Sequence, residues 1–322
     1  MSRLRCLDGI AGLLMIRVVL LHCLQYAGYG HVKSMEITGA LYFSMPWFFF
    51  KAGMFYRHKS TKEVAKKGFY GLIVPLFVFS LIGFILHAFR YLPHDGKSWG
   101  GYVLTQINQL AHDMTFLGNQ PLWFLFILFV VRIVYNVLKE KIGTLPLAVL
   151  CFMISFMLYH STIDYPYYLA SIPAGTMYYI LGHKLRETQY KWSLFIISAA
   201  IYTLCAVFGW NLIDMHWNVC VSGHYLLWIP TSLAGIILIN NIFRCLPNIN
   251  LLEWIGRHSM VIFVTHTLIL EVAIGLFRDF IGIREYGILT IILITSEILV
   301  LPLLITILSN KHLVWMTGKR KT

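Results

Sequence analysis

The chain has 322 residues, of which 58% are hydrophobic and 12% charged, and its mean hydropathy is +0.70. An ordinary soluble domain carries about 25% charged residues, and a single core of this length cannot bury so much apolar surface. The composition excludes a soluble globular enzyme, a disordered chain and a fibrous repeat. It favours an all-α, polytopic membrane protein, because the apolar runs are too long and continuous for the alternating strands of a barrel.

Ten apolar stretches have the roughly 17–25 residues needed to cross the hydrocarbon core of a bilayer. They lie near 7–28, 37–56, 69–91, 121–138, 144–160, 167–184, 192–210, 222–243, 257–277 and 286–309. The first contains Asp8 and Arg17 and no small-residue cleavage site follows it, so we expect a span rather than a cleaved signal peptide. No soluble domain interrupts them, so residues 1–322 are predicted to form one transmembrane domain.

Lysine and arginine are divided unevenly between the loops on the two sides of these spans. Of the 26 such residues, 18 fall in loops on one side, 5 on the other and 3 within spans. The five are Lys33, Arg90, Lys97, Arg278 and Arg284. Basic loops remain in the cytoplasm, which predicts that both termini are cytoplasmic. The formal net charge of +12 is therefore attributed to membrane topology and not to nucleic acid binding.

Six scattered cysteines include no Cys-x-x-Cys pair. They indicate reduced core or lipid-facing residues, with no disulfide framework and no metal site.

Polar side chains inside spans are costly and are therefore functional candidates. In the first span, Asp8 and His22 share a helix face with about 40° between them and about 21 Å along the axis. This stripe suggests a polar tunnel, with His22 either a general base or a buried structural histidine. Arg17 is rotated about 140° from His22 and is expected to point elsewhere. Asp8 is expected to orient a basic group or to cap the helix.

The inner end of the second span carries Lys51, which must either snorkel to the interface or bind an anion. Gly53 nearby permits close backbone approach, and Pro46 would kink the span. The following loop at 57–67 is basic and includes Lys66 and Lys67. It is expected either to contact lipid head groups or to receive an anionic cytoplasmic ligand.

The later spans contain further ionisable groups. Glu271 and Glu297 suggest either proton-relay groups or, as we favour, partners in interhelical pairs. Arg132 lies near an inner end and is expected to snorkel. His266 is open to a structural or a catalytic interpretation.

Five segments in chain order resemble the acyltransferase-3 family of integral membrane acyltransferases, especially its sugar acetylases. They are LDGIAGLLMIRVVLLH (7–22), MPWFFFKAGMFY (45–56), QPLWFLFILF (120–129), IPAGTMYYILGHKL (172–185) and IGRHSMVIFVTHTLIL (255–270). In the first segment, His22 falls at the position of the family's essential histidine. In the last, Phe263 takes the usual tyrosine position and His266 matches the histidine.

Three features usual in the family are missing from this sequence. Ala11 replaces a basic residue, Ala52 replaces a serine, and Phe69 and Gly71 replace the two arginines of an Arg-x-Arg motif. The lost basic positions are associated with the acyl-CoA end. We therefore expect Lys51, Lys66 and Lys67 to supply the displaced positive charge and to bind acyl-CoA.

The resemblance implies transfer of an acyl group, usually acetyl, from cytoplasmic acyl-CoA to a hydroxyl of a cell-surface carbohydrate or glycolipid precursor. The predicted catalytic residues are His22 and Asp8, with Trp123, His266 and Glu271 as further candidates. The expected location is the bacterial plasma (inner) membrane. Two alternatives are a transporter or flippase of a lipid-linked sugar, and a non-catalytic relative that binds a partner.

Overall fold

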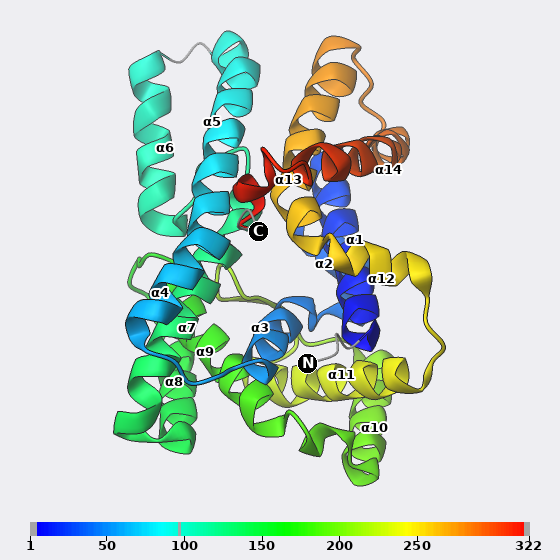
Figure 1. Ribbon diagram of the computed structural model, residues 1–322. Coiled ribbons are helices and arrows are strands. Elements are labelled where there is room, and N and C mark those ends of the chain that lie inside the picture. The colour runs from blue at the N-terminus through cyan, green and yellow to red at the C-terminus, as the bar shows by residue number, and fades with distance from the viewer. Residues whose placement is uncertain (1–4, 96–97, 319–322) are drawn as a thin grey trace.

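Helices account for most of the chain in the computed structural model, which describes residues 5–95 and 98–318 (Figure 1). Within this part, six helical segments are long and apolar enough to cross a membrane: Arg5–Ala27, Thr61–Leu92, Gln120–Ile142, Tyr225–Cys245, Ser259–Phe280 and Tyr286–Leu308. Two shorter apolar helices, Thr144–Tyr159 and Trp192–Phe208, accompany them. The expectation of a multi-pass helical membrane protein is confirmed. Of the charged residues counted above, Arg3, Lys97 and 319–321 lie outside the described residues.

Most predicted spans coincide with a helix of the structure. The corresponding helices are α1 (Arg5–Ala27), α5 (Val74–Asp95), α7 (Trp123–Ile142), α8 (Thr144–Tyr159), α9 (Tyr168–Leu185), α10 (Trp192–Phe208), α11 (Tyr225–Cys245), α13 (Ser259–Ile274) and α14 (Tyr286–Leu308). Short helical turns flank them: η3 (Gln120–Leu122), η4 (Thr188–Tyr190), η5 (Gly275–Phe280) and η6 (Val314–Thr317).

The prediction of one continuous span over 37–56 is wrong. This region contains the end of α2 (His31–Ile37), the turn η1 (Gly39–Leu41) and α3 (Ser44–Met54), which has only 11 residues. Pro46 lies in the first turn of α3, where its missing N–H costs nothing, so it begins the helix and does not kink a longer one.

Close backbone contacts hold α3 inside the bundle. A methyl group on Gly53 would lie 2.0 Å from the carbonyl oxygen of Tyr179 in α9. A methyl group on Gly182 would lie equally near, at 2.0 Å, to the carbonyl oxygen of Phe50. The close approach predicted at Gly53 is therefore confirmed, and it fixes one wall of both cavities described below.

A helix continues from the basic loop into the membrane. It comprises α4 (Thr61–Gly68), a π-helical turn η2 (Phe69–Ile73) and α5. Pro75 follows this turn and has no N–H to donate, and a π turn accommodates such an interruption without ending the helix. The loop between the predicted spans 69–91 and 121–138 contains a further helix, α6 (Trp99–Asp113), which Ser98 caps by accepting a hydrogen bond from the Gly101 N–H. In Figure 1, α5 and α6 stand side by side.

A β-hairpin separates α10 from α11. Its strands, β1 (Leu212–Asp214) and β2 (Val219–Ser222), pair antiparallel with an irregularity between Leu212 and Ile213. The carboxylate of Asp214 accepts hydrogen bonds from the backbone N–H groups of His216 and Trp217, at 2.8 and 3.2 Å. These bonds form the turn that presents Asp214 and His216 to the interior.

Candidate active site

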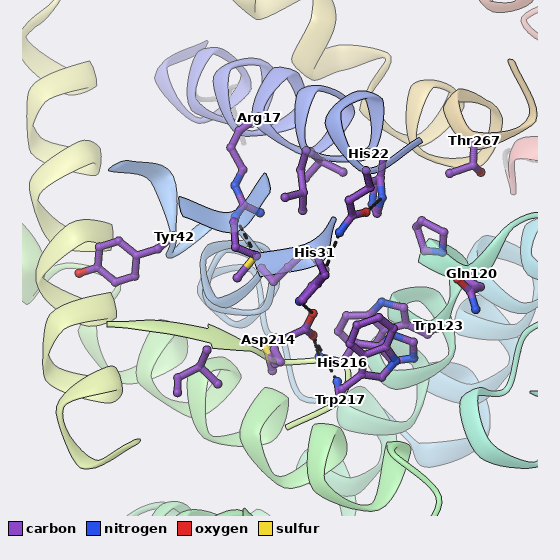
Figure 2. A pocket seen from close by; sticks show the side chains of 18 of the residues that line it. Arg17, His22, His31, Tyr42, Gln120, Trp123, Asp214, His216, Trp217 and Thr267 are labelled. Carbon is purple, nitrogen blue, oxygen red and sulfur yellow. Dashed lines mark hydrogen bonds and ion pairs between the residues drawn. The ribbon is translucent and has the colours of Figure 1, made fainter. Parts of the chain in front are cut away.

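A polar cavity of about 140 Å³ lies between α1, α2, the β-hairpin and the starts of α3 and α7 (Figure 2). We call it the His22 cavity. Its polar and aromatic lining comprises Arg17, His22, Gln25, Tyr26, His31, Tyr42, Gln120, Trp123, Asp214, His216, Trp217, Phe263 and Thr267.

Four side chains in this cavity contact one another in a row. His22 Nδ1 lies 2.8 Å from Gln25 Oε1, and Gln25 Nε2 lies 2.8 Å from His31 Nδ1. His31 Nε2 in turn lies 2.9 Å from Asp214 Oδ2. The row joins α1, α2 and β1 and ends at His22.

The contacts in this row determine which ring nitrogens carry protons. A carboxylate only accepts, so Asp214 favours a proton on His31 Nε2, and His31 Nδ1 then accepts from the Gln25 amide. Gln25 Oε1 also only accepts, so His22 donates through Nδ1. The Nε2 lone pair of His22 is left available, which is the state a general base requires.

Two glycines allow His31 to reach Gln25. Gly28 and Gly30 have φ angles of 106° and 77°, values that favour glycine over other residues. The chain reverses between α1 and α2, and His31, the first residue of α2, returns to face the last turns of α1.

Asp214 is the charged end of the row. Burial acts to raise its pKa, but the His31 contact, the charges of His216 and His31, and the Trp217 N–H together hold the pKa below the usual range of an aspartate. Asp214 is therefore a carboxylate at neutral pH.

The wall opposite His22 is aromatic. The Trp123 ring stacks on His216 with the centroids 4.8 Å apart and the planes 3° from parallel. Buried Asn119 anchors this part of the chain, because its amide donates to the carbonyls of Phe79 and Val264 at 3.3 and 3.0 Å. Trp123 is thereby fixed at the start of α7, inside the cavity.

Arg17 also lines the His22 cavity, so the expectation that it points elsewhere is wrong. Its guanidinium donates to Ser44 Oγ at 3.1 Å and to Met35 Sδ at 3.5 Å. The helical angle places only the Cα, and a long side chain can bend around the helix. Arg17 thus connects α1 to α2 and α3 and adds a positive charge to the cavity.

A second cavity, of about 440 Å³, lies between α3, α4, α7 and α9. We call it the basic cavity because most charged residues of its lining are cations. The lining includes one acidic residue, Glu63, and the basic residues Lys51, Arg57, Lys59, Lys67 and Arg132. Lys51 donates to the carbonyl of Leu7 at 3.2 Å and lies over the Trp47 ring at 5.1 Å. Of the two predicted α4 lysines, Lys67 lines this cavity, whereas Lys66 is exposed and does not line it.

The two cavities meet at an aromatic partition formed by Trp123, Phe124 and Phe263. Trp123 and Phe263 line the His22 cavity, and Phe124 lines the basic cavity. The rings of Phe124 and Phe263 are 5.7 Å apart between centroids. The helix α3 lines both cavities, with Met45 and Pro46 on one side and Phe48 and Lys51 on the other.

A model of the acyltransferase-3 family, described as an acyltransferase domain, matches residues 4–309. The chain belongs to the acyltransferase-3 family. The match covers all the elements that line the two cavities. No curated protein and no solved structure matches the chain.

The four positions expected to depart from the family pattern differ in their relation to the basic cavity. Ala52 lines it, and Phe69 and Gly71 lie in η2, directly after Gly68 of its lining. Ala11 is buried in α1. Lys51 and Lys67 thus line the same cavity as Ala52.

Asp8 lines neither cavity. It is buried in the first turn of α1 against α12 (Asn250–Arg257), with Oδ2 4.0 Å from Arg257 Nε. A methyl group on Gly256 would lie 1.8 Å from the Asp8 carbonyl oxygen, so α1 and α12 leave no room between them. The predicted polar tunnel along this face of α1 is wrong, because the face is filled by α12.

His266 is buried beside His22, with the ring centroids 5.3 Å apart. Its Nδ1 lies 3.1 and 2.9 Å from the carbonyl oxygens of Ile262 and Phe263, which favours donation from Nδ1. His266 does not line the His22 cavity.

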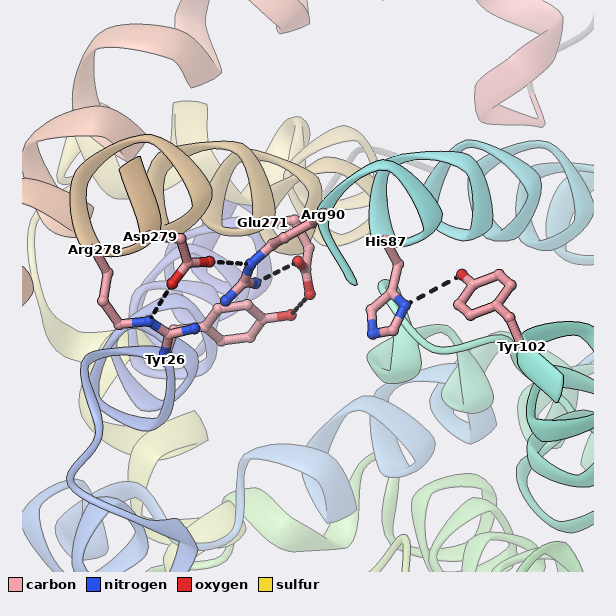
Figure 3. A network of polar contacts seen from close by, with 7 residues as sticks. All are labelled: Tyr26, His87, Arg90, Tyr102, Glu271, Arg278 and Asp279. Atoms are coloured by element: carbon pink, nitrogen blue, oxygen red, sulfur yellow. Dashed lines mark hydrogen bonds and ion pairs between the residues drawn. The ribbon is translucent and has the colours of Figure 1, made fainter. Parts of the chain in front are cut away.

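Glu271 takes part in an interhelical network outside the His22 cavity (Figure 3). Its carboxylate accepts from Tyr26 Oη at 2.9 Å and pairs with Arg90 at 2.6 Å. The favoured interpretation of Glu271 as one half of an interhelical pair is confirmed. The same expectation for Glu297 is wrong, since neither of its buried carboxylate oxygens has a hydrogen-bond partner in the described part of the chain.

Four residues of the site went unnoticed in the sequence: Gln25, His31, Asp214 and His216. Gln25 carried a signal, because a residue three positions after His22 lies on the same side of a helix. Asp214 and His216 carried none, since only the tertiary fold brings the hairpin against α1.

Proposed function

We propose that this acyltransferase-3 protein transfers an acyl group, in the simplest case acetyl, from acyl-CoA to a hydroxyl of a cell-surface carbohydrate or glycolipid precursor. The observation that carries the proposal is the row Asp214–His31–Gln25–His22, which ends at an available imidazole nitrogen in a polar cavity. A hydroxyl is a poor nucleophile at neutral pH, and a positioned histidine accelerates its reaction about 10²–10⁴-fold.

The transfer requires one base and no covalent enzyme intermediate. His22 Nε2 accepts the hydroxyl proton while the oxygen attacks the thioester carbonyl. The carbon–sulfur bond then breaks, and the imidazolium returns the proton to the departing thiolate. Direct transfer is favoured because, among the described residues, the cavity lining contains no cysteine or serine to form an acyl-enzyme, and the hydroxyl of Thr267 donates to Asn119 Oδ1.

The basic cavity is the proposed site of the acyl-CoA phosphates. Lys51, Lys67 and Arg132 provide cations on the side predicted to be cytoplasmic. The thioester would extend from there to the aromatic partition and present its carbonyl beside Trp123. The indole N–H of Trp123 is the candidate donor for the developing negative charge.

Asp8 and Glu271, both candidates for a catalytic role in the sequence, are proposed to have structural roles. Asp8 is proposed to position α1 through its contact with α12. Glu271 is engaged by Arg90 and Tyr26, and this pairing gives no support to the alternative of a sugar flippase with an intramembrane proton-relay glutamate.

The test follows free thiol release from acetyl-CoA by purified protein, with and without a crude lipid-linked glycan extract. We expect glycan-dependent release that His22→Ala abolishes and that His312→Ala, a change at an exposed histidine, preserves. Equal release from the native protein and His22→Ala, across several acyl-CoA donors and acceptors, would contradict the proposal.

A further inference from the structure

Positive charge gathers at one place on the side predicted to be extracytoplasmic. That side has five lysines and arginines, and three of them, Arg90, Arg278 and Arg284, line a single pocket of about 620 Å³. Basic residues are disfavoured on this side of a membrane protein. Topology therefore gives no reason for this cluster, which we call the arginine pocket.

The arginine pocket is built from the ends of four helical segments. Ala27 and Gly28 come from the end of α1, and Arg90 and Tyr91 from α5. The remaining lining comes from η5 and the region around the start of α14: Arg278, Asp279, Arg284, Tyr286 and Leu289.

An ion-pair network orients two of the three guanidinium groups (Figure 3). Arg90 pairs with Glu271 at 2.6 Å and with Asp279 at 2.7 Å, and Arg278 pairs with Asp279 at 2.7 Å. Arg284 is exposed and has no ion pair in the described part of the chain. Among the described residues, three cations therefore face the two carboxylates of this network, which leaves one positive charge and several N–H donors for a ligand.

An apolar groove adjoins the arginine pocket and shares Arg90 and Asp279 with it. The groove is lined by Leu86, Phe89, Val272 and Phe280. Phe89 and Phe280 are 78% and 85% exposed, which suits contact with a hydrocarbon chain. A pocket for an anionic group thus lies next to a surface for a lipid tail.

Tyr26 connects the arginine pocket to the His22 cavity. Its ring lines the His22 cavity, and its hydroxyl donates to Glu271, the partner of Arg90. A sugar attached to a group in the arginine pocket therefore lies within a few side chains of His22.

We propose that the arginine pocket binds the phosphate ester of a lipid whose tail lies in the adjoining groove. Arginine matches this ligand because its planar fork donates two hydrogen bonds to phosphate oxygens. The inference rests on the proposed function. It specifies that the acceptor of acyl transfer is a lipid-linked sugar whose phosphate is bound in the arginine pocket. An ordinary anionic phospholipid offers the same chemistry.

The test measures binding without requiring catalysis. Dodecyl phosphate is added to the protein in dodecyl maltoside, and thermal stabilisation and the ³¹P resonance are followed, with dodecanol and inorganic phosphate as matched probes. Arg284→Gln, which disrupts no ion pair seen in the described residues, and Arg278→Gln are compared with Lys33→Gln. We expect stabilisation by dodecyl phosphate only, at least 5-fold weaker binding in either arginine variant, and no change in Lys33→Gln or His22→Ala.

The outcomes separate this inference from the proposed function. If the protein binds dodecyl phosphate through these arginines but transfers no acyl group, the phosphate site is supported and the proposed acyltransferase function is contradicted. If Arg284→Gln, Arg278→Gln and the native protein bind dodecyl phosphate equally and acyl transfer is normal, the phosphate site is contradicted and the acyltransferase function is not. Competition by vesicles of phosphatidylcholine with 20% phosphatidylglycerol would support the phosphate site and assign it to bulk phospholipid, whereas resistance to them would assign it to the acceptor.

Discussion

The His22 cavity and the basic cavity differ in how firmly their polar side chains are held. In the first, four side chains from three elements contact one another at 2.8–2.9 Å. In the second, Lys51 donates to a backbone carbonyl at 3.2 Å, and Lys67 is an exposed side chain in the last turn of a short helix. The polar side chains of the His22 cavity are therefore held by contacts with one another, whereas the lysines and arginines of the basic cavity have in common only their positive charge.

This difference matches the chemistry proposed for each cavity. Proton transfer depends on the distance and angle between two atoms, so its groups must be held by neighbours. Attraction of phosphate depends on the number of nearby cations and falls slowly with distance. The proposal that Lys51 and Lys67 supply the positive charge expected at positions 11, 69 and 71 is compatible with this distance dependence, whereas His22 has to stay within reach of the reacting hydroxyl.

The largest effect is expected from His22→Gln, which keeps a hydrogen-bonding side chain but removes the base. The turnover rate should fall about 10²–10⁴-fold, the range supplied by general base catalysis. The KM for acyl-CoA should stay unchanged, because the donor is bound in the other cavity. Steady-state kinetics separate the two constants, and a change confined to KM would contradict the division between the cavities.

A smaller loss is expected from Asp214→Asn, which removes the carboxylate that sets the protons of the row. Transfer should fall roughly 10–100-fold, as for other partners that orient a functional histidine. The pH dependence of turnover should also shift, which a purely structural role would not produce. Asp164→Asn, at an exposed aspartate in a loop, is the matched control.

The basic cavity is tested by Lys51→Met and Lys67→Met, which should each raise the KM for acyl-CoA by about 10-fold or less, since one cation among several is lost. Lys66→Met is the control, because Lys66 neighbours Lys67 but does not line the cavity. If neither Lys51→Met nor Lys67→Met changes donor affinity, or if Lys66→Met has the largest effect, the proposed donor site is wrong.

The smallest effect concerns stability. The pKa of Asp214 is lowered in the folded protein, so its charge stabilises the fold at pH values above the ordinary aspartate pKa of about 3.9. This contribution is lost as the pH falls through the folded pKa. The melting temperatures of native protein and Asp214→Asn should differ at pH 7, and the difference should shrink as the pH falls below the ordinary aspartate pKa. A constant difference would show that Asp214 contributes through packing alone.

Local sequence patterns predicted the long helices and His22, because hydropathy and helix periodicity are properties of neighbouring residues. The same patterns failed at 37–56, where apolar residues are buried by protein in a short helix and not by lipid. They also failed for Arg17, whose long side chain reaches the His22 cavity although its helical position is rotated about 140° from that of His22.

The rest of the site depends on contacts between distant segments. Asp214 is 192 residues from His22, and a turn held by its own carboxylate places it beside His31. The partition between the cavities similarly joins Phe124 in α7 to Phe263 in α13. No pattern of residue spacing in the sequence predicts a contact between segments so far apart in the chain.

The central claim is that the acyl donor and the acceptor reach the site from opposite sides of the membrane, and a sided transfer assay in proteoliposomes tests it most directly. Cysteines introduced at Lys62 and Lys33 in a cysteine-free background would report orientation, with position 62 predicted to be cytoplasmic and position 33 external. We predict acetylated glycan only when acetyl-CoA is supplied on the Lys62 side and the lipid-linked glycan is exposed on the Lys33 side. Transfer with both substrates confined to one face would contradict the account.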